Sequence, residues 1–144
     1  MKSSLLSGLA GAIVMIAGAA HAHGPSRAPS GHAGESVAID FSQPLPNVPG
    51  KSLVAVEVVY APGASSPSHS HADSAFIYAH VVSGRIESKV DDGPARIYEA
   101  GESFHELPGS HHPVSRNASA TEPAKLLAVF VVDSDETELT TADK

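Results

Sequence analysis

Short apolar runs separated by turn-forming residues follow one another along most of the chain. Runs with strand-like composition cover residues 37–41, 53–60, 75–82, 85–90, 95–98, 104–106 and 125–132. The segment Asp91-Asp92-Gly93-Pro94 separates two of these runs, which predicts a β-hairpin. No stretch after the N-terminal segment shows the periodicity of a convincing amphipathic helix. Short strands at this regular spacing predict an all-β fold, either a sandwich or a barrel.

The first 22 residues have the three parts of a signal peptide. Lys2 supplies the positive start, residues 5–19 form an apolar run, and Ala20-His21-Ala22 offers a small-x-small cleavage site. An uncleaved membrane anchor is the alternative, although the apolar run is short and interrupted by glycines. We therefore expect a periplasmic or secreted protein, with no stable membrane insertion after cleavage.

Composition divides the rest of the chain into three parts. Residues 23–35 are rich in Gly, Pro, Ser and Ala, which predicts a flexible linker. Residues 36–132 contain the predicted strands and have the size of one domain. Residues 133–144 form an acidic tail, which we expect to be loose.

Charge and residue content exclude several classes of function. The formal net charge of −7 argues against a nucleic acid as partner. The chain has no cysteine, so it can form neither disulfides nor a thiolate nucleophile. It also lacks the Gly-x-Ser-x-Gly elbow of serine hydrolases and the glycine-rich loops that bind phosphates.

Two histidine clusters are the clearest chemical signal. The first is His69-Ser70-His71, and the second follows about forty residues later as Gly109-Ser110-His111-His112. Side chains two residues apart on a strand point to the same side, so three of these imidazoles can converge inside a closed β structure. Such convergence is typical of a metal site.

The residues around both clusters resemble the two motifs of the cupin superfamily. Gly63, His69 and His71 fit the first motif, G-x(5)-H-x-H-x(3,4)-E-x(6)-G, and Gly101, Gly109 and His112 fit the second, G-x(5)-P-x-G-x(2)-H-x(3)-N. The resemblance covers about residues 36–132. It implies a double-stranded β-helix, or jelly-roll barrel, with one metal held by His69, His71 and His112. His111 is the alternative to His112, because a slip of one residue exchanges the side chains that enter the barrel.

The chain departs from these motifs in places that concern the site. Leu107 replaces the proline of the second motif, and Asn117 comes one residue late. The segment Ala75-Phe76-Ile77 stands where the first motif would supply its glutamate. The carboxylate of the family's site is therefore missing at its usual position.

Glu106 is our candidate for the replacement carboxylate. By alternation it shares a strand face with Phe104, and the family pattern turns that face toward the barrel interior. A buried carboxylate is costly unless it is paired, protonated or bound to a cation. We therefore predict that Glu106 acts at or beside the metal. An inert, solvated glutamate at the barrel mouth is the alternative, and Asp73 is a weaker candidate because it could equally cap a turn.

Alternation also suggests a lining for the pocket. We expect Phe76, Tyr78, His80 and Phe104 to face the barrel interior, which would make the pocket mostly apolar. Nearby basic residues are few, and we interpret them as surface charges: Arg85, Lys89, Arg96 and Arg116. Small aromatic or diketone-like ligands fit this lining better than phosphorylated sugars.

The residues and the resemblance together predict a protein that binds one divalent transition metal and a small organic molecule. Fe(II) is favoured, because an open three-histidine iron site can take a substrate and then dioxygen, as in dioxygenases of the cupin superfamily; Zn, Cu, Ni and Mn also suit such ligands. We expect a metal-dependent dioxygenase. Two alternatives stay open, a non-catalytic metal- or ligand-binding module and a zinc-dependent isomerase or hydrolase. We also expect a homodimer, since small cupins commonly pair through exposed strands.

Overall fold

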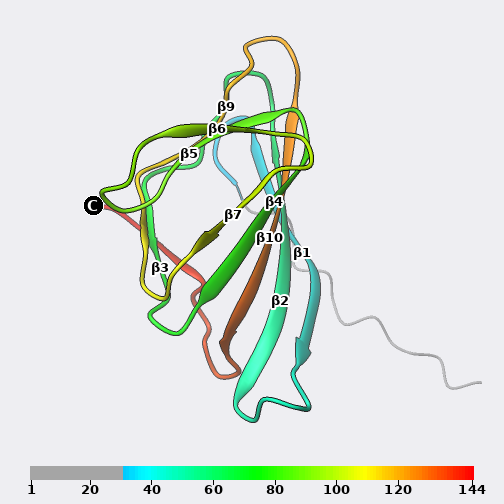
Figure 1. Cartoon of the computed structure of the whole chain (residues 1–144), viewed down its shortest axis with the longest axis vertical. Helices are drawn as coiled ribbons and strands as arrows, with labels where there is room; N and C mark the ends of the chain where they lie inside the picture. Colours follow the sequence, from blue (N-terminus) through cyan, green and yellow to red (C-terminus); the bar gives the residue numbers. More distant parts are fainter. Residues whose placement is uncertain (1–30) are drawn as a thin grey trace, which may run out of the picture.

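The computed structural model describes residues 31–144, all of whose regular elements are strands (Figure 1). The predicted signal peptide and residues 23–30 of the predicted linker lie outside the described residues. The strands are β1 (Glu35–Pro44), β2 (Lys51–Tyr60), β3 (His69–His71), β4 (Phe76–Ser83), β5 (Arg85–Lys89), β6 (Arg96–Glu99), β7 (Ser103–Glu106), β8 (His111–His112), β9 (Val114–Asn117), β10 (Ala124–Asp133) and β11 (Thr140–Ala142). Residues 31–144 contain no helix long and apolar enough to cross a membrane. The all-β prediction is confirmed.

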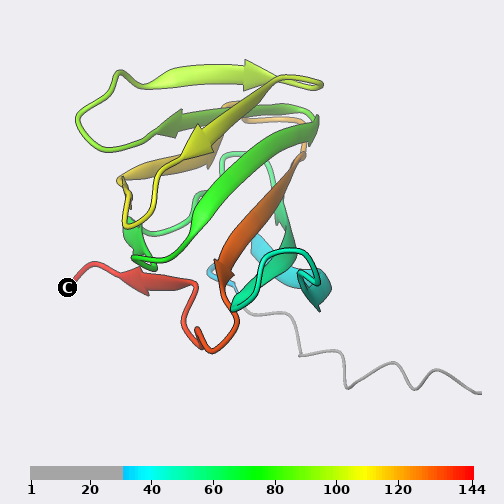
Figure 2. The same cartoon turned by 60° about the horizontal axis from the view of Figure 1, so that its bottom comes forward.

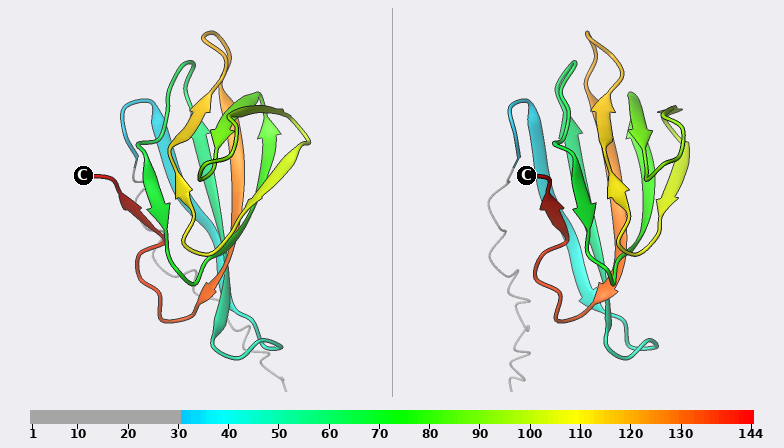
Figure 3. Two further views of the ribbon diagram at one scale, coloured as in Figure 1. Left: turned by 60° about the vertical axis from the view of Figure 1, so that its left-hand side comes forward. Right: turned by 90° about the vertical axis from the view of Figure 1, so that its left-hand side faces the viewer.

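The strands form three antiparallel sheets that enclose a common interior. The five-stranded sheet has the order β1-β2-β10-β4-β7, and the two smaller sheets have the orders β11-β3-β8 and β6-β5-β9. Figures 2 and 3 show the two small sheets on one side of the molecule and the five-stranded sheet on the other. The predicted hairpin between residues 85 and 98 is present as β5 and β6.

The core lies between these layers and follows from strand alternation. Every second residue of the central strand β10 is buried, from Ala124 to Val132. In register with β10, alternate residues of β4 are also fully buried, with Ile77 opposite Phe130 and Ala79 opposite Ala128. Neighbouring strands therefore present their apolar sides to the same interior.

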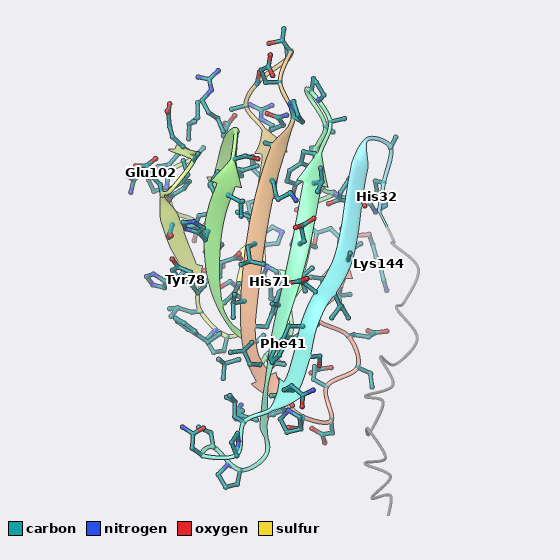
Figure 4. The ribbon with its side chains drawn as sticks, turned by 90° about the vertical axis from the view of Figure 1, so that its right-hand side faces the viewer. His32, Phe41, His71, Tyr78, Glu102 and Lys144 are labelled. Carbon is teal, nitrogen blue, oxygen red and sulfur yellow. The ribbon has the colours of Figure 1, made fainter. Side chains whose placement is uncertain are left out.

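The predicted lining of the interior by β4 is wrong for three residues. Phe76 and Tyr78 are 41% and 47% exposed, and His80 lies on the same outer face of the five-stranded sheet. Figure 4 looks onto this sheet and labels Tyr78. Both faces of the run are apolar, so alternation tells which residues share a face but not which face is buried. Phe104 on β7 is partly buried and packs against the core, as predicted.

The acidic tail is more ordered than predicted. Residues Thr140–Ala142 form β11, which pairs with β3 so that Thr140 lies opposite His71 and Ala142 opposite His69. The amide of Asp143 donates a hydrogen bond to the carbonyl oxygen of Ser68 at 3.0 Å. The prediction of a loose tail failed because β3 has a free edge, which the tail covers. The linker also ends one residue earlier than predicted, since Glu35 begins β1.

Replacing Ile86 on β5 by alanine should lower the free energy of unfolding by about 2–5 kcal/mol, because its side chain is fully buried and the change leaves a cavity. Ile97 on the adjacent strand β6 is 51% exposed and is the matched control, for which Ile97→Ala should cost less than about 0.5 kcal/mol. Urea unfolding of the two variants and the wild type measures both changes. Equal costs at the two positions would contradict the described core.

Candidate metal centre

Three histidines from two short strands lie together in the interior. His69 and His71 are two residues apart on β3, and His112 lies on β8, where it pairs with His69. One ring nitrogen from each lies within 4.8 Å of the others. The predicted convergence of His69, His71 and His112 is therefore present, and these three residues could hold a divalent metal ion.

A tight turn before β8 brings His112 to this position. The amide of Gly109 donates to the carbonyl of Ala72 at 3.1 Å, and the amide of His71 donates to the carbonyl of Ser110 at 2.9 Å. Gly109 has a φ of +73°, and a Cβ atom there would lie 2.9 Å from the Oδ1 atom of Asp73. The turn thus requires glycine at this position. Asp73 is exposed beside the turn and does not line the described cavity, so it is not the missing carboxylate.

His111 points away from the three histidines. Its Nε2 atom lies 2.8 Å from the Oδ2 atom of Asp143 and 3.0 Å from the Oγ atom of Ser68. These contacts connect β8 to the C-terminal segment at the surface. Of the two neighbouring histidines, His112 is the one that enters the interior.

Hydrogen bonds orient two of the three rings. The Nδ1 atom of His69 donates to the carbonyl oxygen of Pro67 at 2.8 Å, which leaves its Nε2 atom as an acceptor for a cation. The Nε2 atom of His112 and the Oγ atom of Ser88 are 2.8 Å apart, which leaves the Nδ1 atom of His112 on the side of Glu106. Both rings therefore offer one nitrogen to the interior.

Glu106 lies among these histidines, on the inner face of β7 as its alternation predicts. Its side chain is only 3% exposed, and its Oε2 atom lies 2.9 Å from the Nε2 atom of His71 and 3.3 Å from the Nδ1 atom of His112. Its cross-strand neighbour is Ile77, one of the residues that stand where the family motif has glutamate. The carboxylate therefore enters the interior from the adjacent strand.

The contact between Glu106 and His71 is close but poorly aligned. Both ring nitrogens of His71 and the Oε2 atom of Glu106 are buried without a properly directed hydrogen bond to any residue of 31–144. A buried carboxylate oxygen and a buried imidazole cost free energy in that state. A divalent cation between them would satisfy both groups, so the donor set fits a metal.

The electrostatics of the site favour the protonation states that bind metals. Burial lowers the pKa of His112 to about 4 and also lowers the pKa of His69, so both rings are neutral near pH 7. Burial alone would raise the pKa of Glu106, but its contact with His71, together with the positive charge that the neighbouring histidines carry when protonated, outweighs burial and lowers it. Neutral imidazoles beside an ionised carboxylate are what a divalent cation needs.

The same cavity contains a second polar cluster, which sequence reasoning missed. The cavity measures about 250 Å³, and much of its wall is apolar. The Tyr60 hydroxyl lies 2.6 Å from the Oγ atom of Ser66 and 2.9 Å from the Oγ atom of Ser115, and the hydroxyl of Ser66 donates to a carboxylate oxygen of Glu35. Burial raises the pKa of Tyr60 above its ordinary value of 10.0, which keeps the phenol neutral. No local motif marks these residues, because they are brought together from four separate segments.

Comparison with solved structures shows the fold. A protein from Klebsiella pneumoniae subsp. pneumoniae, described as uncharacterized with a double-stranded β-helix domain, is 20% identical with a TM-score of 0.60, over 81% of this chain and 91% of that chain. KdgF from Halomonas sp. is 19% identical with a TM-score of 0.57, over 72% and 84%. An oxalate oxidase in complex with glycolate is 23% identical with a TM-score of 0.52, over 69% and 51%. The predicted double-stranded β-helix is confirmed.

Comparison of sequences shows the family. No curated protein matches the chain significantly. The sequence profile described as the cupin domain matches residues 56–130, which is more than half of the chain and includes the three histidines and Glu106. The chain therefore belongs to the cupin family.

Proposed function

We propose that this protein is a metal-dependent oxygenase that binds one divalent transition metal, with Fe(II) favoured, and acts on a small organic molecule. His69, His71 and His112 hold the metal, and Glu106 supplies a carboxylate at or beside it. The observation that carries the proposal is the convergence of buried polar atoms of His71 and Glu106 that have no aligned partner among residues 31–144. Iron in such a site would supply dioxygen chemistry beside a bound substrate.

The residues of the chain have separate tasks in this proposal. The carbonyl of Pro67 and the hydroxyl of Ser88 hold the rings of His69 and His112 in the orientation that a metal needs. Glu106 is ionised and can hold or accept a proton next to a bound substrate. The largely apolar wall of the cavity suits a small organic molecule. The oxalate oxidase named above has the same fold, which supports oxidative chemistry on this scaffold.

Export and dimerisation are further parts of the proposal. The signal-peptide pattern of residues 1–22 supports a periplasmic or secreted location. A row of outward residues crosses the five-stranded sheet in register from Phe41 through Ala55 and Val129 to Tyr78. Both aromatic ends of this row are exposed, and Figure 4 labels them. A homodimer that packs these faces together would cover them.

The wild-type protein, purified without chelators or an affinity tag, should contain about one equivalent of a divalent transition metal. His69→Ala/His71→Ala should abolish metal binding, and Glu106→Gln should weaken it by about 10- to 100-fold, because a charged oxygen at the site is lost. His105→Ala is the matched control, since His105 is the exposed neighbour of Glu106 on β7. Elemental analysis and competition with a fluorescent chelator measure these changes.

The identity of the metal decides between the oxygenase and its alternatives. Stoichiometric iron, with dioxygen uptake on adding catechols or diketones, would support the oxygenase. Zinc would favour an isomerase or hydrolase instead. Wild-type protein that binds no metal after reconstitution, or that binds it equally well after the double histidine change, would contradict the proposed centre.

Tyr78→Glu should convert the dimer into a monomer, because it places a charge within the proposed apolar contact. Ile97→Glu is the control, since Ile97 is equally exposed but lies on a different sheet. Light scattering of the wild type and both variants at one concentration measures the masses. A wild-type monomer, or a dimer unaffected by Tyr78→Glu, would rule out this interface.

A further inference from the structure

We propose that the cavity selects a ligand whose end away from the metal is neutral or positively charged, and that Glu35 receives this end. The inference rests on the proposed metal centre, and it names the chemical class of the ligand. The acceptor is the Glu35–Ser66–Tyr60–Ser115 cluster described above, which lines the same cavity as the three histidines.

The cavity wall contains carboxylates but no lysine or arginine. Among its described residues, the acidic side chains are Glu35 and Glu106, and the basic ones are histidines, namely His32 and the three candidate metal ligands. Two arginines of the barrel are engaged elsewhere. Arg116 donates two hydrogen bonds to Glu87, at 2.8 and 2.6 Å, and Arg96 lies over the ring of Tyr98.

This distribution of charge disfavours a ligand with an anionic far end. An anionic group that binds directly to the metal would be neutralised there. A second carboxylate or a phosphate would instead lie in the negative field of Glu35, with no lysine or arginine of the described wall to pair with. An ammonium group, or a hydroxyl or amide that donates a hydrogen bond, is favoured by the same field.

Glu35 is placed to make this contact. It is the first residue of β1 and is half-buried at the cavity. The amide of His32 donates to its Oε2 atom at 3.2 Å, and the hydroxyl of Ser66 donates to its Oε1 atom. A carboxylate oxygen can accept two hydrogen bonds, so each oxygen of Glu35 retains capacity for a ligand. Glu35 lines the same cavity as His69, His71 and His112.

The hydrogen bonds behind Glu35 all run in one direction. Because the only hydroxyl proton of Ser66 goes to Glu35, the Tyr60 hydroxyl must donate to Ser66, and Ser115 must then donate to Tyr60. The chain of donors therefore ends on the carboxylate. It compensates the charge of Glu35 and fixes its position before any ligand enters.

The size of the cavity limits the ligand further. At ~30 Å³ for each water-sized group, a volume of about 250 Å³ accommodates roughly eight non-hydrogen atoms. A single ring with one short polar substituent has this size. Its ring or first polar group would lie at the metal and its substituent at Glu35.

Three pyridines with different para substituents test the preference for charge. In each, the ring nitrogen can bind a metal and the substituent cannot reach back to it. The probes are 4-(aminomethyl)pyridine, a cation at pH 7, 4-ethylpyridine, which is neutral, and isonicotinate, an anion of nearly the same size. Protein loaded with Co²⁺ is titrated with each probe, and the visible spectrum of the cobalt reports binding.

The cation should bind about tenfold or more tightly than the anion. Glu35→Gln keeps the shape of the side chain but removes its charge. It should reduce this ratio of affinities to less than about threefold, mainly because the cation binds more weakly, while the affinity for 4-ethylpyridine stays the same. Glu57→Gln removes the same charge from the outer face of β2, where Glu57 pairs with Lys125, and should leave the ratio unchanged.

The possible failures are distinguishable. Tighter binding of the anion, a ratio unchanged by Glu35→Gln, or Co²⁺ uptake without a response to any pyridine would overturn the inference alone. Protein that takes up no Co²⁺ would overturn the proposed metal centre, and the inference with it.

Discussion

The pairing of His69 with His112 is the contact on which the site depends. It joins β3 and β8, strands of only three and two residues, so few backbone hydrogen bonds hold the donors together. The turn at Gly109 adds bonds between the same segments, and β11 covers the other edge of β3. Three donors thus converge because neighbouring segments support strands too short to be stable on their own.

Glu106 supplies the carboxylate of the site from β7, whereas the family motif would supply it from residues 75–77. Ile77 is the last residue of this segment, and Glu106 is its direct partner across β4 and β7. Cross-strand partners lie about 5 Å apart and point to the same face, so the exchange moves the carboxylate by only one strand spacing. The apolar Ile77 then contributes to the core, while β7 takes over the polar role.

The sequence predicts those parts of the site that depend on local order. Spacing and alternation place His69, His71 and Glu106 correctly, because period two fixes which residues share a face. Alternation fails for Phe76 and Tyr78, since the run is apolar on both faces and only the register with β10 decides between them. The cluster of Glu35, Tyr60 and Ser66 is not predictable in this way. Ser66 contacts Glu35 and Tyr60 contacts Ser115 across long stretches of the chain, and none of these residues belongs to a motif.

The docking of β11 places Thr140–Ala142 beside the candidate metal centre. Ala142 lines the cavity, and Asp143 is hydrogen-bonded to Ser68 and His111, which are the chain neighbours of His69 and His112. Residues fused after Lys144 therefore begin within reach of the cavity mouth. A polyhistidine tag at this end would bring additional imidazoles close to the three native ones. The metal content measured on such a fusion would include metal bound by the tag as well as metal bound by the site. The position of the affinity tag therefore affects the measured stoichiometry.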